Sequence, residues 1–242
     1  FYNPLFKNSL ELAATIGAPP PLIYDFSLDG RQWGEKHNRA VTLALFDTAG
    51  ENLQEAAVAR QMVQYLSEAS GIIFLVDPLQ VPAVRDALPP HVQPPKLDAE
   101  AAPNQIIANV LQLLERGKVL EANAPISIPV AIALTKCDVL VEAGLIELNR
   151  LWSTEKRHIG CYDTQMHEDM NGMMGEYFQR YIRDAYNNIR IRFARHAFFG
   201  VSATGCASDS VTRRYKYISP WRVEDPLLWL LAELNVIRKC QE

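Results

Sequence analysis

The chain has 242 residues, of which 48% are apolar and 21% charged, a composition typical of a globular protein rather than a disordered or coiled-coil chain. Its formal net charge of −4 disfavours a protein whose main role is to coat nucleic acid. The apolar runs, such as residues 72–76, are far shorter than the ~20 residues that cross a membrane, so no transmembrane segment is predicted.

Two strands are predicted near the N-terminus. Residues 22–28 alternate between the two faces of a strand, and Asp29-Gly30 then offers a turn. Residues 40–46 form the next apolar run. This pattern favours neighbouring strands, joined as a hairpin by a long loop.

Helical patterns separate most of the apolar runs that follow. Three further strands are expected at 71–76, 128–134 and 197–201, and helices at 52–69, 104–122 and 175–196. The last helix begins with Asp225 as its N-cap and Pro226 at its first position. Strands that alternate with helices predict an α/β domain with a mostly parallel sheet. Ligands of such domains bind at the carboxyl ends of the strands.

Two segments are longer than the connections that such an α/β domain needs. Residues 78–103 hold seven of the fifteen prolines, which predicts an extended surface loop. Residues 151–174 are polar and irregular, and with the arginine-bearing helix that follows they form an insertion over about 151–195. We therefore expect a single domain over residues 1–242 that carries two insertions.

Four cysteines are too few and too widely spaced to indicate a disulfide scaffold or a zinc motif. They are interpreted as free thiols in a reducing cytosol, which predicts a cytoplasmic protein. A weaker metal signal comes from His158, Cys161 and His167, whose spacing matches no structural zinc site. Trp221 and Trp229 are expected to be core anchors.

The strongest functional signal is a set of three short motifs, each directly after a predicted strand. They are DTAG at residues 47–50, TKCD at 135–138 and SAT at 202–204. In this order they resemble the motifs of P-loop GTPases of the Ras-like and translation-factor class. DTAGENLQE and VEDPLLWLL more narrowly resemble the bacterial double-GTPase group. The resemblance spans about residues 22–237. It implies a three-layer, doubly wound sheet and a guanine-nucleotide switch that hydrolyses GTP slowly.

By this resemblance, the second and third motifs bind the base. Asp138 would accept two hydrogen bonds from the guanine edge, and charged hydrogen bonds are strong enough to discriminate against adenine. Lys136 would lay its stem on the base plane, and Thr135 stands where the family most often has Asn. Ser202 and Ala203 would bring a backbone N–H to the guanine oxygen, and Thr204 completes this motif.

The first motif would serve the phosphates of GTP or GDP and a Mg²⁺ ion. Asp47 would hold Mg²⁺ through water, and Gly50 would let a backbone N–H approach the γ-phosphate. Glu51 stands where Ras-like enzymes have the glutamine that orients water, and it suits the first turn of a helix equally well. Thr15 is the candidate for the threonine that contacts Mg²⁺.

The phosphate-binding loop G-x-x-x-x-G-K-[ST] is absent from the sequence. Two explanations stay open: the loop lies upstream of Phe1, or the chain is an inactive pseudo-GTPase that acts as a protein-interaction scaffold. The expected partners are a guanine nucleotide and proteins that dock on the switch region or the insertions, with no nucleic acid.

Overall fold

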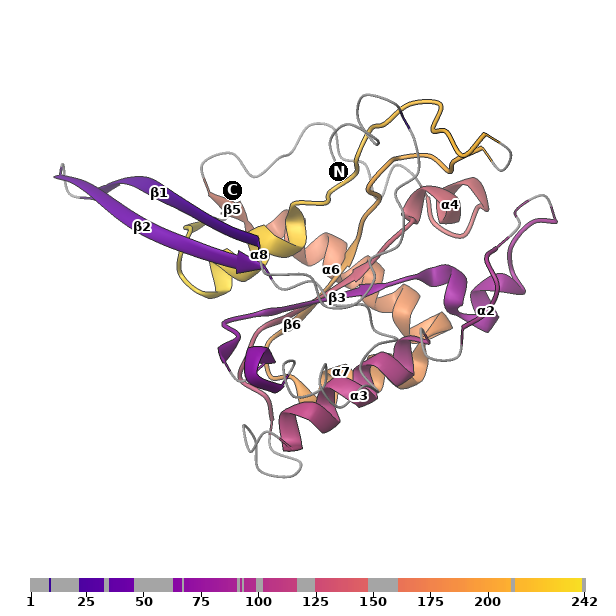
Figure 1. The fold of residues 1–242 in the computed structure, drawn as a ribbon, viewed down its shortest axis with the longest axis horizontal. Coiled ribbons are helices and arrows are strands. Elements are labelled where there is room, and N and C mark those ends of the chain that lie inside the picture. The colour runs from indigo at the N-terminus through magenta and orange to yellow at the C-terminus, as the bar shows by residue number, and fades with distance from the viewer. Residues whose placement is uncertain are drawn as a thin grey trace.

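The computed structural model describes residues 9, 22–32, 35–45, 63–66, 68–90, 92, 94–98, 102–116, 125–147, 161–209 and 212–240. Its centre is a three-stranded parallel sheet in the order β3-β4-β6 (Figure 1). The strands are β3 (Ile72–Val76), β4 (Val130–Leu134) and β6 (His196–Gly200). All five residues of β4 are buried, as expected for the middle strand of a parallel sheet. The three expected strands and the mixed α/β class are confirmed.

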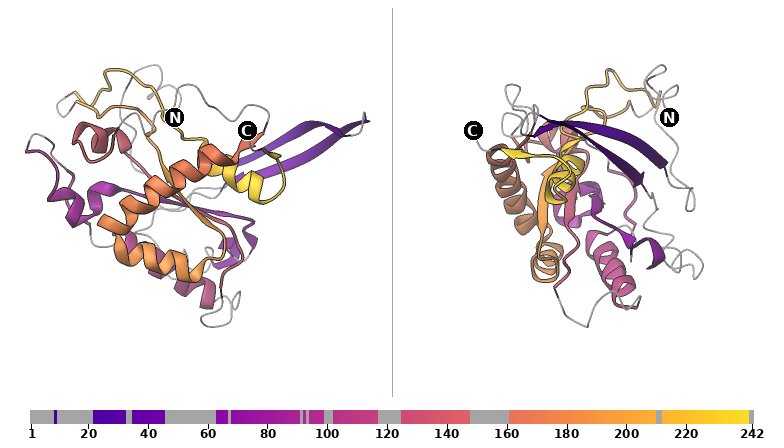
Figure 2. Two further views of the ribbon diagram at one scale, coloured as in Figure 1. Left: turned by 180° about the vertical axis from the view of Figure 1, so that it is seen from behind. Right: turned by 90° about the vertical axis from the view of Figure 1, so that its left-hand side faces the viewer.

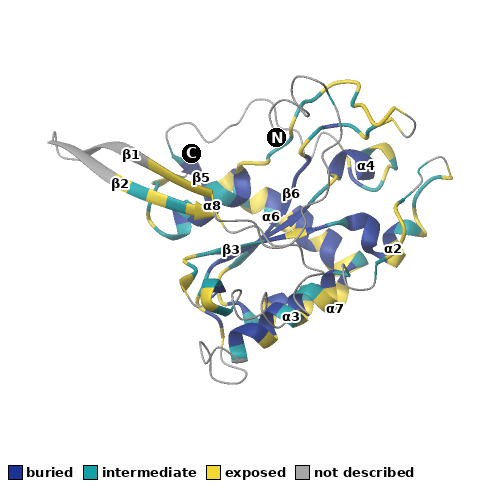
Figure 3. Cartoon of the chain, in the orientation of Figure 1, coloured by how far each residue is buried: buried dark blue, intermediate teal, exposed yellow. Residues whose placement is uncertain are grey.

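Helices cover both faces of this sheet (Figure 2). Phe74, Ile132 and Phe198 point to one face, where they form a first core with the helices. These helices are α3 (Pro103–Arg116), α6 (Thr164–Tyr181) and α7 (Arg183–Arg192). The opposite face carries a smaller second core that packs on α8 (Asp225–Glu233). Its buried residues are Ala131, Ala133, Tyr162, Ala197, Phe199, Val201, Trp229, Leu230 and Ala232. Figure 3 shows buried residues on the sheet and on the inner sides of the helices.

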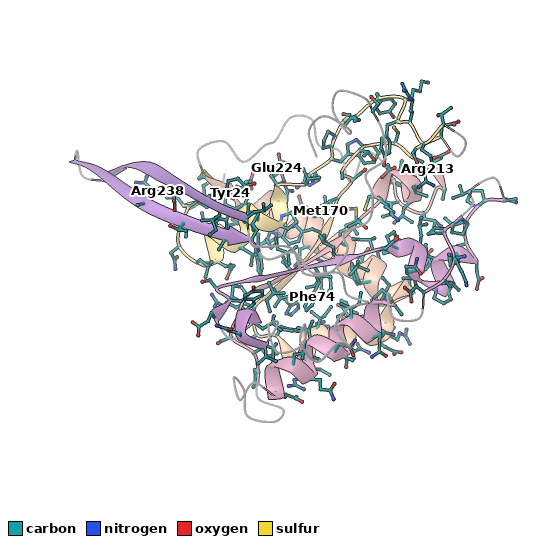
Figure 4. The ribbon with its side chains drawn as sticks, in the orientation of Figure 1. Tyr24, Phe74, Met170, Arg213, Glu224 and Arg238 are labelled. Carbon is teal, nitrogen blue, oxygen red and sulfur yellow. A yellow bond between two sulfur atoms is a disulfide. The ribbon has the colours of Figure 1, made fainter. Side chains whose placement is uncertain are left out.

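The segment before the arginine-bearing helix is regular where the structure describes it. Residues 164–174 belong to α6, so the irregular segment expected at 151–174 is wrong from residue 164 onward. Asp163 starts the helix, because its side chain accepts a hydrogen bond from the Met166 backbone N–H at 2.9 Å. Buried methionines, including Met170 in Figure 4, then anchor the helix to the first core. The single helix expected at 175–196 is divided at Ile182 between α6 and α7.

The proline-rich segment is folded at its start. Asp77 caps the short 3-10 helix η3 (Pro78–Gln80), and α2 (Pro82–Arg85) follows. Prolines occupy first helical positions, where their missing N–H costs nothing. Residues 78–81 are buried. The expected extended surface loop is therefore wrong for this part, and Pro103 already belongs to α3.

The predicted hairpin is present, with longer strands than expected. β1 (Leu22–Gln32) pairs antiparallel with β2 (Glu35–Leu45), from Leu22 opposite Leu45 to Gln32 opposite Glu35. Asp29-Gly30 therefore lies within β1 instead of forming the turn. The hairpin projects from the rest of the molecule as a two-stranded ribbon (Figures 1 and 2).

The C-terminal part folds back beside the start of α6. β7 (Lys239–Cys240) pairs in parallel with β5 (Tyr162–Asp163), and a disulfide joins Cys161 to Cys240. The expectation of four free thiols is therefore wrong for this pair, while Cys137 and Cys206 are free. The two bonded cysteines are 79 residues apart in sequence, so their spacing alone could not indicate the pairing.

Candidate functional site

The residues predicted to serve phosphate and Mg²⁺ lie outside the described residues. They are Thr15, Asp47, Gly50 and Glu51. Their expected roles stay predictions that the structure does not test. The residues predicted to bind the base are described, and they gather where β4 and β6 end.

The TKCD turn is held against both neighbouring strands. The Thr135 backbone N–H and hydroxyl both donate to the Val76 carbonyl at the end of β3, at 2.9 and 3.1 Å. The Cys137 N–H donates to the Val201 carbonyl after β6, at 3.1 Å. Lys136 between them adopts φ 52, in the left-handed region, and α4 (Cys137–Glu142) follows directly. The turn thus links all three strands of the sheet.

Asp138 and Ser202 contact one another. The Ser202 hydroxyl donates to the Asp138 carboxylate at 2.6 Å, and the Ser202 Oγ in turn accepts the Gly205 N–H at 2.8 Å. Ser202 is 1% exposed and Asp138 8% exposed. The structure thus brings these two predicted residues together. However, the carboxylate that was expected to bind guanine is here hydrogen-bonded to a protein hydroxyl.

Lys136 has a partner that the motifs did not indicate. Its ammonium lies 2.7 Å from the Asp77 carboxylate, directly after β3. The other oxygen of this carboxylate accepts the Leu79 N–H at 2.9 Å. The signal that could have found Asp77 is its place after a buried strand, where a carboxylate meets the neighbouring strand end. Both side chains are partly exposed, so the pair contributes little stability.

The loop after β6 folds back on itself. Ser202 and Trp221 exchange backbone hydrogen bonds of 3.1 and 2.8 Å, so the Ser202 N–H donates to a protein carbonyl. Gly205 adopts φ +75, and a Cβ on it would lie 2.1 Å from the Ser219 carbonyl oxygen. Only glycine fits this position. Ala203 is exposed, and the Thr204 hydroxyl donates to the Cys206 carbonyl at 2.9 Å.

Two hollows in the described surface lie away from this cluster. One, of about 350 Å³, lies beside the break between α6 and α7, with Val81, Pro103 and Arg183 in its lining. The other, of about 560 Å³, lies between α3 and α7. Neither is lined by a residue predicted to bind nucleotide.

The weak metal signal does not assemble in the part of the chain that the structure describes. Cys161 is in a disulfide, His167 lies among aromatic rings, and His158 is outside the described residues. No group of three or more His, Cys, Asp or Glu side chains suited to a metal occurs among the described residues. Trp229 is a core anchor as predicted, whereas Trp221 is half-buried.

Comparison with known proteins shows a distant relative. No protein-family model matches the sequence, and no solved structure matches it. The chain is 24% identical, over an alignment 259 residues long, to "Putative ESX-1 scaffolding and assembly protein SaeC" of Mycolicibacterium smegmatis. The alignment covers 98% of this chain and 64% of SaeC, so the chain spans less than two thirds of its relative.

This relative corrects the functional interpretation of the motifs. SaeC is named as a scaffolding and assembly protein, not as a P-loop GTPase, and it aligns with nearly the whole chain. The assignment to P-loop GTPases is therefore wrong, and so are the GTP-hydrolysing switch and the associated terms nucleotide-binding and hydrolase. Three short motifs at strand ends were too little to identify a family, because one fold carries many functions.

None of the described helices combines the length and the apolar character that a membrane crossing requires.

Proposed function

We propose that the chain is a protein-interaction scaffold that holds components of a secretion apparatus together during assembly. The observation that carries this proposal is the alignment of 98% of the chain with a protein named for ESX-1 scaffolding and assembly. The partners that we propose are proteins of such an apparatus. A cytoplasmic location stays part of this proposal, although the free thiols expected of a cytoplasmic protein are not found at Cys161 and Cys240.

The polar cluster at the strand ends supports a structural role. Asp138, Ser202 and Gly205 form one hydrogen-bonded chain, and Lys136 pairs with Asp77. These polar groups therefore already have hydrogen-bond or ion-pair partners within the protein. These contacts hold the loop after β6 against the end of β4. A scaffold would thereby have a surface of fixed shape at this end of the sheet.

The hairpin supports protein binding more directly. Apolar side chains at the base of β1 and β2 are exposed: Leu22 by 50%, Ile23 by 63%, Tyr24 by 52% and Leu45 by 37%. Tyr24 is labelled on this ribbon in Figure 4. Leu22, Tyr24 and Leu45 lie on one face of the ribbon and Ile23 on the other, so apolar side chains are exposed on both faces at its base. Exposed apolar residues gathered at one place mark interaction sites. A two-stranded ribbon is also marginally stable by itself in water, so a partner that packs on it would stabilise both. We refer to Leu22, Ile23, Tyr24 and Leu45 as the hairpin patch.

Site-specific cross-linking in the cells that produce the protein tests this proposal. A photoreactive amino acid replaces Ile23 in the hairpin patch, and in a control it replaces Ile191, which is 72% exposed on α7. We expect a discrete adduct with one protein from position 23 and not from position 191. Co-expression of that protein should then yield a stoichiometric complex. Absence of an adduct from position 23, or an adduct whose partner forms no complex on co-expression, would overturn the proposal.

A further inference from the structure

The last residues of the described chain form a strap across the second core. We define the strap as residues 234–240, which follow α8 and end in β7. Ile237 of the strap packs against the second core. Tyr162, the strand partner of Lys239, is only 1% exposed. In Figure 1, β5 and the C-terminus lie side by side next to α8.

Hydrogen bonds and an ion pair hold the end of the strap. The Tyr162 N–H donates to the Arg238 carbonyl at 2.7 Å, and the Thr164 hydroxyl donates to the Cys240 carbonyl at 3.0 Å. The Lys239 ammonium lies 2.6 Å from the Glu233 carboxylate, but the lysine side chain is 44% exposed. A two-residue strand pair and an exposed ion pair are weak restraints. The disulfide is therefore the strongest link between the strap and α6.

The disulfide is accessible, while the free thiol of Cys137 is not. Cys161 and Cys240 are both partly exposed, so a small thiol can approach the bond. Cys137 is fully buried, and burial raises the pKa of its thiol to about 12. A protonated, buried thiol is a poor nucleophile, so Cys137 does not compete with an external thiol.

We propose that the Cys161–Cys240 disulfide is a redox clasp, and that low-molecular-weight thiols open the strap while the sheet stays folded. One thiolate attacks the disulfide and forms a mixed disulfide, and a second thiolate displaces the protein sulfur. In sum, two RSH molecules and the protein disulfide give two cysteine thiols and RSSR. The strap then leaves β5 and uncovers the part of the second core under Ile237.

The remainder of the fold does not depend on this clasp. The first core lies on the opposite face of the sheet from the strap, and β3, β4 and β6 pair with one another and not with the strap. Local opening of a terminal segment costs less free energy than global unfolding when few buried contacts are lost. This proposal does not rest on the scaffold function, and its test needs no partner protein.

Limited trypsin digestion of the full chain tests the clasp, because trypsin cuts after Arg238 (Figure 4). Samples are treated with or without glutathione, digested, quenched and then fully reduced before mass spectrometry. We expect cleavage after Arg238 to become about tenfold faster with glutathione. Cleavage after Arg213, also labelled in Figure 4 and exposed in the loop after β6, serves as the internal standard and keeps its rate.

Two cysteine variants complete the experiment. Cys240→Ser should show the fast cleavage without glutathione, while Cys206→Ser, which removes a free cysteine, should behave as the wild type. Urea unfolding of Cys240→Ser should stay a single cooperative transition with native helix content. Slow cleavage of Cys240→Ser would overturn the proposal, because the strap would stay closed without the bond. Loss of the folded sheet in this variant would also overturn it, because the disulfide would then hold the whole domain.

Discussion

Ser202 joins three parts of the chain through one hydroxyl group. It donates to Asp138 at the start of α4 and accepts from Gly205 in the loop after β6. Both contacts are buried, so water cannot replace them readily. Removal of a buried hydrogen-bonding group costs more than the bond itself contributes, because its partners are left unsatisfied. Substitutions of Ser202 should therefore lower the free energy of unfolding.

We expect Ser202→Ala to lower the free energy of unfolding by about 1–3 kcal/mol, because the Asp138 carboxylate loses its donor. Urea denaturation followed by circular dichroism measures this change. The control is Ala203→Ser on the neighbouring exposed residue, which should stay within about 0.5 kcal/mol of the wild type. Equal stability of Ser202→Ala and the wild type would contradict the importance of this contact.

Asp225 gives a pH-dependent prediction. Its carboxylate is buried and lies 2.6 Å from the Arg222 guanidinium. Burial outweighs the ion pair and raises the pKa of Asp225 from 3.8 to about 6. The folded state therefore holds this proton more tightly than the unfolded state. The resulting stabilisation is complete below pH 3.8 and is lost as the pH rises through about 6.

Asp225→Asn stays neutral and should lack this decline. We expect the unfolding free energy of the variant minus that of the wild type to grow by up to about 3 kcal/mol between about pH 4 and about pH 7. Urea titrations across this range measure the difference, with Asp184→Asn on the exposed face of α7 as the control. A difference that does not change with pH would contradict the raised pKa.

At the scale of elements, the loop from Ser202 to Trp221 depends on one glycine. The positive φ of Gly205 and the closeness of the Ser219 carbonyl leave no room for a Cβ. Gly172 in α6 provides a matched contrast, because a Cβ there would meet nothing within 4 Å. The two glycines therefore predict opposite effects of the same substitution.

We expect Gly205→Ala to destabilise the protein by more than about 2 kcal/mol, because the backbone must move to avoid the carbonyl. Gly172→Ala should instead stabilise it by up to about 1 kcal/mol, because alanine restricts the unfolded chain and suits a helix interior. Thermal and urea unfolding of both variants measure these shifts. Equal effects of the two substitutions would contradict the described geometry of the loop.

Elements with one strong local signal were predictable from the sequence. The runs that became β3, β4 and β6 are short, apolar and flanked by polar residues, which is typical of buried parallel strands. The hairpin turn was misplaced because Asp29-Gly30 resembles a turn, while strand pairing continues past it to Gln32. Residues 164–174 are polar on average, and their sequence does not show that the methionines among them are buried against the first core.

At the scale of the whole molecule, fold class was predictable and function was not. Alternating strands and helices indicated an α/β domain, and the motifs at 135–138 and 202–204 do meet at one end of the sheet. Their meeting follows from parallel strands, which bring their carboxyl ends to one edge whatever the protein does. Asp77 and the disulfide were missed because each depends on contacts between residues far apart in sequence.

A calorimetric titration of the chain with the protein cross-linked from position 23 tests the scaffold function most directly. We predict stoichiometric binding whose affinity is the same with GDP, with GTP or without nucleotide. Ile23→Asp should weaken binding at least about tenfold, while Ile191→Asp, a change of the same kind on α7, should not. Binding that requires GTP, or that Ile23→Asp leaves unchanged, would contradict a scaffold that binds through its hairpin patch.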